Sequence, residues 1–146
     1  MRNVAAFGNF KWDILRNGFN ESPFFTSDFP VAIEETADWR VHNRVVPLAP
    51  NLAVRIRPDL SIDRKHADFS FADFGYRVSD VSHAELVKIN QLIVRCAEDT
   101  VFYRDDFPWV RKFIKRNRHY RVEMATDKLP TKKGTFVVFR QRIVAS

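Results

Sequence analysis

The sequence predicts an α+β domain with a largely antiparallel sheet, two main helices and a C-terminal hairpin. Strand-like alternation of apolar and polar residues comes before, between and after two stretches of helical periodicity. The strands and helices do not alternate regularly, as they would in a parallel α/β sheet. A length of 146 residues suits a single domain over residues 1–146 with one core, to which fourteen phenylalanines contribute.

The first strands are predicted from period-2 patterns. In residues 10–14, apolar side chains at positions 10, 12 and 14 alternate with Lys11 and Asp13, which are therefore expected to face water. An Asn-Gly pair then gives a turn signal. Residues 31–34 resume an extended run.

The middle of the chain contains another predicted strand and then a long irregular segment. In residues 52–57, alternating apolar residues leave Arg55 and Arg57 on the side expected to face water. Residues 58–79 lack clear periodicity. Their aromatic residues favour a self-packed Ω-loop or short hairpin over a binding lid.

Two helices have recognisable start signals. Ser82 and Glu85 form a capping box, and apolar residues continue at helical spacing to about Glu98. Pro108 marks the start of a second helix, in which an apolar stripe lies opposite a basic side. Residues 101–103 form a short predicted strand between the helices.

The last quarter of the chain is a basic hairpin region. Residues 120–124 alternate again, and a turn over 127–134 leads to a strand over 136–144. The net charge is +6, but residues 111–146 carry eleven Lys or Arg against two acidic residues, a net +9. Residues 1–110 carry thirteen against sixteen, a net −3. The basic character therefore belongs to the second helix and the hairpin.

This basic face is the strongest sequence signal for a partner. Clustered cations attract phosphates through counterion release, and aromatic residues among them stack on bases where exposed. The alternative is a solvated face that only keeps the helix soluble. The predicted binding residues are Arg111, Lys112, Lys115, Arg116, Arg118 and Lys132, and the candidate stacking residues are Trp109, His119 and Tyr120.

The stretch PFFTSDFPVAIE places a carboxylate between two apolar runs. Asp28 cannot form the usual Asx-turn, because the residue two positions later is Pro30, which has no N–H. We expect Asp28 to be partly buried and to bond elsewhere in the fold as a polar knot at a strand corner. Its candidate partners are the Thr26 and Ser27 hydroxyls, the Val31 amide, Asn90 or an arginine. The alternative is an acid/base or ligand-contacting carboxylate, supported by Thr26, Ser27 and Asn90.

Two further residues fall on the apolar face of the first helix. Asn90 needs its buried amide satisfied and is expected to bond to loop backbone rather than to a ligand. Cys96 is expected to be a small core residue. A single cysteine cannot form an internal disulfide, so the sequence favours a reducing compartment, and we expect a cytoplasmic location without membrane attachment.

Signatures of metal and nucleotide chemistry are missing from the sequence. The four histidines have neither HExxH nor Cys/His spacing. The four glycines are isolated, so neither a P-loop nor a dinucleotide fingerprint is present. We therefore expect no metal and no cofactor.

The string at residues 23–31, together with Trp12 and the helical segment Ile89-Asn90-Gln91-Leu92 through Ala97-Glu98, resembles a bacterial family, the domain of unknown function numbered 4238. Its members show a Phe-Ile-Thr-Ser-Asp-Asn-Pro-Val motif, a downstream Pro-Leu-x-Pro, here at 47–50, and an Asn-bearing helix ending near Tyr103. The resemblance covers residues 12–103. Phe29 stands where the family usually has Asn, and the family's opening His-Tyr-Val-Pro segment is absent.

The resemblance implies a fold and no reaction. The absent opening segment leaves three alternatives: the chain is a fragment, the C-terminal portion of a longer family architecture; a shortened paralogue; or half of a split gene with a separately encoded N-terminal partner. Two hypotheses follow from the sequence. The favoured one is a non-catalytic interaction domain whose basic C-terminal face binds nucleic acid or an acidic protein. The other is a hydrolase-like enzyme, or its remnant, using Asp28 as base or metal ligand.

Overall fold

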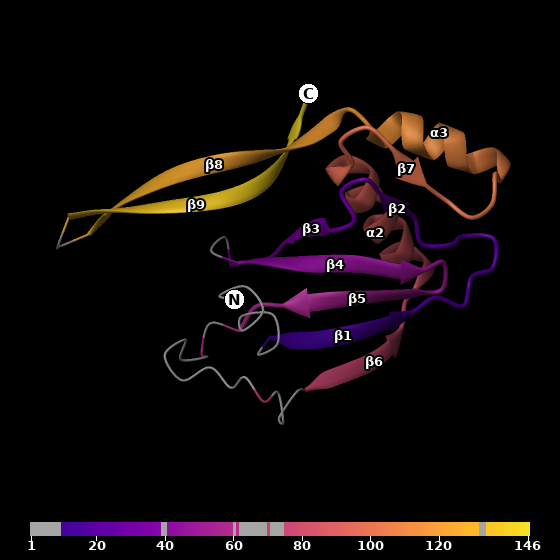
Figure 1. Cartoon of the computed structure of the whole chain (residues 1–146), viewed down its shortest axis with the longest axis horizontal. Coiled ribbons are helices and arrows are strands. Elements are labelled where there is room, and N and C mark those ends of the chain that lie inside the picture. The colour runs from indigo at the N-terminus through magenta and orange to yellow at the C-terminus, as the bar shows by residue number, and fades with distance from the viewer. Residues whose placement is uncertain (1–9, 39–40, 60, 62–69, 71–74, 132–133) are drawn as a thin grey trace.

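The structure, a computed structural model, describes residues 10–38, 41–59, 61, 70, 75–131 and 134–146. These residues form a five-stranded sheet with the order β3-β4-β5-β1-β6, two helices and a C-terminal hairpin (Figure 1), which confirms the predicted α+β class. The elements are β1 (Lys11–Arg16), β2 (Thr26–Ser27), β3 (Ala32–Glu35), β4 (His42–Ala49), β5 (Leu52–Arg57), β6 (Tyr76–Asp80), α2 (His83–Cys96), β7 (Val101–Phe102), α3 (Pro108–Asn117), β8 (Tyr120–Thr131) and β9 (Gly134–Ala145).

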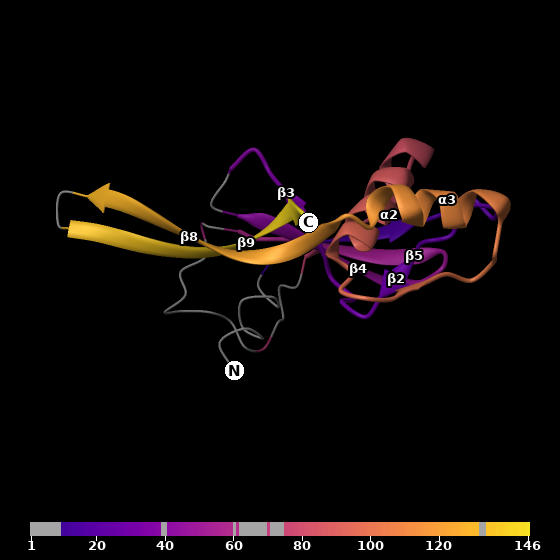
Figure 2. The same ribbon diagram turned by 90° about the horizontal axis from the view of Figure 1, so that it is seen from above.

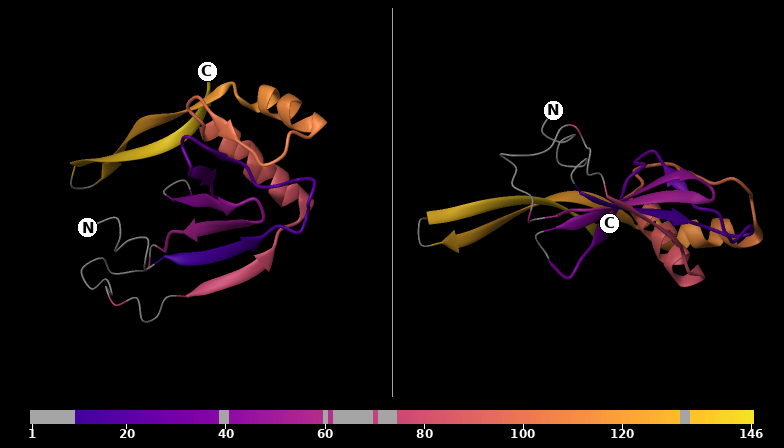
Figure 3. Two further views of the ribbon diagram at one scale, coloured as in Figure 1. Left: turned by 45° about the vertical axis from the view of Figure 1, so that its right-hand side comes forward. Right: turned by 90° about the horizontal axis from the view of Figure 1, so that it is seen from below.

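The main sheet is antiparallel except at one edge. The pairs β3–β4, β4–β5 and β1–β5 are antiparallel, whereas β6 joins β1 in parallel. Helix α2 lies across one face of this sheet (Figures 2 and 3). The short strands β2 and β7 pair with each other beside it.

The core lies between the sheet and α2. From the helix, Leu86, Ile89 and Ile93 are buried against residues of β1, β3, β4 and β5. Phe25, fully buried, stacks on Trp109 of α3 with 5.7 Å between ring centroids. The predicted apolar stripe of α3 therefore does face the core.

Both helices start where the sequence predicts. The Ser82 hydroxyl accepts a hydrogen bond from the Glu85 backbone N–H at 3.2 Å, as a helix N-cap requires. The Glu85 carboxylate does not complete a reciprocal capping box but accepts a bond from Arg55 at 2.8 Å. Pro108 is the first residue of α3, where its missing N–H costs nothing.

The predicted orientation toward water is wrong for Asp13 and Arg55, whereas Lys11 is exposed as predicted and Arg57 is partly exposed. Asp13 and Arg55 lie on the sheet face that α2 covers. Asp13 is only 1% exposed, with one carboxylate oxygen 2.8 Å from Nε of Arg57. These charges neutralise one another inside the fold, an arrangement that apolar alternation alone does not reveal.

The C-terminal hairpin projects away from the sheet (Figures 1 and 2). Its strands pair without interruption from Tyr120 opposite Ala145 to Thr131 opposite Gly134. The hairpin is confirmed, but β8 continues four residues beyond Asp127, where the turn was predicted to start.

Among the described elements, β2, β4 and β6 were not predicted as strands. β6 falls in the segment predicted to be irregular, and its residues are largely exposed, so no burial pattern marks them in the sequence. Most of the predicted Ω-loop, residues 62–69 and 71–74, lies outside the described residues. Within the described part, no helix is long and apolar enough to cross a membrane.

Candidate functional site

The carboxylate of Asp28 is held entirely by backbone amides. Its Oδ1 accepts hydrogen bonds from the N–H groups of Phe29 and Glu98, both at 3.0 Å. Its Oδ2 accepts from Asp99 at 2.7 Å and from Thr100 at 2.9 Å. Asp28 thus ties the loop that leaves α2 to the β2 corner. The predicted polar knot is present, but the expected partial burial is wrong, because Asp28 is exposed. The candidate partners were also wrong, because the four donors are backbone N–H groups that the sequence did not indicate.

These four bonds disfavour a catalytic role for this carboxylate. The N–H donors, with Asp99 contributing most, hold the pKa of Asp28 below its ordinary value, because they stabilise the charged form. Four donors also occupy about as many lone-pair positions as a carboxylate offers. Asp28 is therefore a weak base, and its oxygens have no free lone pair with which to accept a proton or bind a metal ion.

The other residues of the hydrolase hypothesis do not converge on Asp28. The Ser27 hydroxyl donates to the carbonyl of Phe29 at 2.7 Å. Asn90 is 2% exposed; its Oδ1 accepts from the Phe25 N–H at 3.0 Å, and its Nδ2 donates to the Pro23 carbonyl at 2.9 Å. The predicted bonding of Asn90 to loop backbone is confirmed.

Thr26 and Cys96 are the remaining residues that the sequence hypotheses named. Thr26 lines a cavity on the other side of the β2–β7 pair. Cys96 is buried, and burial raises the pKa of its thiol, in keeping with the predicted core role. In the part of the chain that the structure describes, no group of three or more His, Cys, Asp or Glu side chains is arranged to hold a metal.

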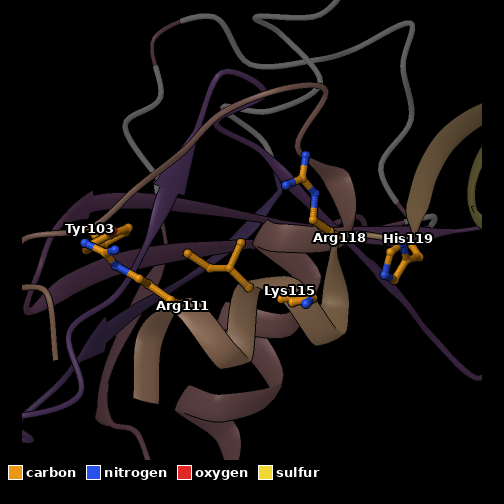
Figure 4. Close-up of a pocket in the computed structure, with 6 residues that line it drawn as sticks. Tyr103, Arg111, Lys115, Arg118 and His119 are labelled. Atoms are coloured by element: carbon orange, nitrogen blue, oxygen red, sulfur yellow. The ribbon is translucent and has the colours of Figure 1, made fainter. Parts of the chain in front are cut away.

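A cavity of about 510 Å³ opens on the basic side of α3 (Figure 4). Three cations from α3 and its C-cap, spaced four and three residues apart, line it. Tyr103, at the end of β7, lies beside the guanidinium end of Arg111, and His119 lies beyond Arg118 at the other end (Figure 4). We call this the cationic cavity, and its lining residues are Tyr103, Arg111, Ile114, Lys115, Arg118 and His119.

The basic face therefore divides into two stripes. Lys112 and Arg116 are exposed on α3 but do not line the cationic cavity. Among the described residues, no carboxylate is paired with Lys115 or Arg118, nor with either of these two. Lys132, the sixth predicted binding residue, lies outside the described residues.

Arg111 differs from the other cations because it has an internal partner. Its Nε donates to Oδ1 of Asp106 at 3.1 Å, and a second bond joins the same two side chains. This contact raises the pKa of Arg111 and lowers that of Asp106. Part of the charge at this end of the cavity is therefore already balanced.

Of the three predicted stacking residues, only His119 lines the cavity. Trp109 packs against Phe25 and donates its Nε1–H to the Glu21 carbonyl at 3.3 Å. Tyr120 lies under the guanidinium of Arg95, 4.4 Å from the ring centroid. Sequence reasoning missed Tyr103, whose position beside the basic helix depends on how β7 pairs with β2.

Comparisons of this chain with protein-family models, with curated proteins and with solved structures gave no match. The resemblance to the family numbered 4238 therefore stays a prediction.

Proposed function

We propose that this domain binds nucleic acid through the basic surface of α3, with a phosphate in the cationic cavity. The observation that carries the proposal is that Arg111, Lys115 and Arg118 line one cavity together with the rings of Tyr103 and His119. We further propose that the domain binds nucleic acid without catalysing a reaction on it. We place this binding in the cytoplasm, where nucleic acid is available.

The charge distribution supports a polyanion rather than a face that is only solvated. A solvated helix face commonly interleaves acidic and basic residues, which pair along the helix. Here Lys112, Lys115, Arg116 and Arg118 are exposed without a carboxylate partner among the described residues. Their mobile counterions are released when phosphates replace them, and this release drives binding at low salt.

The aromatic residues favour nucleic acid over an acidic protein. Acidic side chains offer charge alone, whereas a nucleotide offers a phosphate and a flat ring together. Tyr103 and His119 lie at opposite ends of the row of cations (Figure 4). The two rings therefore flank the cations, so an aromatic surface lies next to each end of the row that would contact phosphates.

The first experiment measures binding of a fluorescent single-stranded oligonucleotide by polarisation, from about 50 to about 200 mM salt. Phosphates neutralised fully by Lys115 and Arg118 and only partly by Lys112 and Arg116 predict a slope of roughly −2 for the logarithm of the association constant against the logarithm of salt concentration. No binding, or an affinity independent of salt, contradicts the proposal. Stronger competition by polyglutamate than by unlabelled oligonucleotide would point to an acidic protein instead.

A matched pair of double variants tests the cavity itself. Lys115→Gln with Arg118→Gln removes two charges that line the cavity, and Lys112→Gln with Arg116→Gln removes two from the same face outside it. The first pair is expected to reduce the salt slope by about 1.4 and the second by clearly less. Equal losses would mean that only the total charge matters.

A further inference from the structure

Tyr103 lines the cationic cavity and also a second, mainly apolar groove. This groove has a volume of about 290 Å³. Phe102, Leu48, Pro47 and Pro50 line it together with Arg104. The two cavities share Tyr103 and no other lining residue.

Two apolar side chains of this groove are unusually exposed. Phe102 is 53% exposed and Leu48 is 60% exposed, whereas Phe25 is fully buried in the core. The Phe102 ring therefore contributes less to the core than a buried phenylalanine does, and it lines a groove that shares Tyr103 with the cationic cavity. The ring does present a flat apolar surface to a ligand that the cations attract.

The Asp28 network fixes the position of this ring. Phe102 pairs with Thr26 in the short β2–β7 sheet. The N–H of Thr100, two residues before Phe102, donates to Asp28, and the Thr100 carbonyl accepts from the Asp28 N–H at 3.1 Å. On the other side, Tyr103 packs against Phe25 with 6.1 Å between ring centroids. The backbone that carries the exposed Phe102 ring is therefore fixed by hydrogen bonds before it and by aromatic packing after it.

We infer that the groove is a base-stacking site for single-stranded nucleic acid, in which a base lies on Phe102 while a neighbouring phosphate lies in the cationic cavity. This inference rests on the proposed function and names its ligand more closely. In a duplex the bases are paired and stacked on one another, so their faces cannot reach Phe102. Stacking tolerates any base, so little sequence preference is expected.

The test compares three probes of equal length: a single-stranded oligonucleotide, the same backbone without bases, and a duplex. The abasic strand carries the same phosphates, so its affinity reports charge alone. We expect the abasic strand to bind about tenfold more weakly than the normal single-stranded oligonucleotide. The duplex is expected to bind more weakly than the single strand under the same conditions.

Variants of the ring complete the test. Phe102→Ala is expected to weaken binding of the normal single strand about tenfold and to leave abasic binding unchanged. Phe139→Ala is the matched control, because Phe139 is also exposed, at 70%, but lies on the hairpin. Phe102→Trp keeps a stacking surface, so it should bind at least as well as wild type, with its added emission quenched by the oligonucleotide.

The possible failures can be told apart. Equal binding of normal and abasic strands, or a tighter duplex, overturns the stacking site and leaves the polyanion proposal standing. Loss of binding to every probe overturns both. If Phe102→Ala does not fold, as judged from its melting curve, the abasic comparison and Phe102→Trp still decide the question.

Discussion

Nε of Arg55 lies 2.8 Å from Oε2 of Glu34 in the interior between the sheet and α2. The side chains are 13% and 8% exposed. Arg55 also donates to Glu85 of α2 at 2.8 Å. Burial alone would lower the pKa of Arg55, but its bonds to Glu85 and Glu34 outweigh burial and raise the pKa. This cluster joins β3, β5 and α2, so the sheet and the helix depend on it.

Replacing Glu34 by Gln is expected to destabilise the fold by about 3 kcal/mol, because it leaves the buried Arg55 with only part of its counter-charge. Urea unfolding measures the change in free energy. Arg16→Gln is the control, since the Arg16–Asp80 pair is exposed and its loss should cost less than about 1 kcal/mol. Similar costs for the two variants would contradict the role assigned to the buried cluster.

Asn90→Ala is expected to cost roughly 2–4 kcal/mol of stability, because it leaves the buried N–H of Phe25 and the carbonyl of Pro23 without partners. Urea unfolding again measures the loss. Oligonucleotide affinity of the folded fraction should not change. A variant as stable as wild type that loses oligonucleotide binding would make Asn90 a ligand-contacting residue instead.

The fold was largely predictable because its elements carry local signals. Ser82 and Pro108 mark both helix starts, and the alternating residues of β8 and β9 mark the hairpin. The sequence did not show which charged side chains of the strands face solvent and which are buried. A charged side chain such as Arg55 counts as solvent-facing in a sequence pattern, whereas its buried partner, Glu34, lies 21 residues away in the chain.

The candidate site could be predicted only in part, for a similar reason. The cations of α3 are close together in the sequence, so their clustering was visible there. Tyr103 comes from another part of the chain, just after β7, and its place beside Arg111 depends on tertiary packing. The partners of Asp28 were unpredictable because three of them, from Glu98 to Thr100, are main-chain groups about 70 residues later.

Asp28→Asn is expected to lower the melting temperature at neutral pH, because an amide cannot accept four N–H bonds as a carboxylate does. The lowered pKa of folded Asp28 means that its stabilising effect is fully present above its ordinary pKa of 3.8. The effect is lost as pH falls through the lower, folded-state value. The melting-temperature difference between wild type and variant should therefore shrink in acid, and a difference independent of pH would contradict this account.

Asp106→Asn is expected to tighten oligonucleotide binding about threefold at low salt, because it frees Arg111 at the end of the cationic cavity to meet one more phosphate. Polarisation titrations measure the change, and the salt slope should steepen with it. Asp80→Asn is the matched control: it also removes one negative charge and frees an arginine, Arg16, but at the sheet edge away from the cavity. An equal gain in both variants would mean that net charge, and not the geometry around Arg111, sets the affinity.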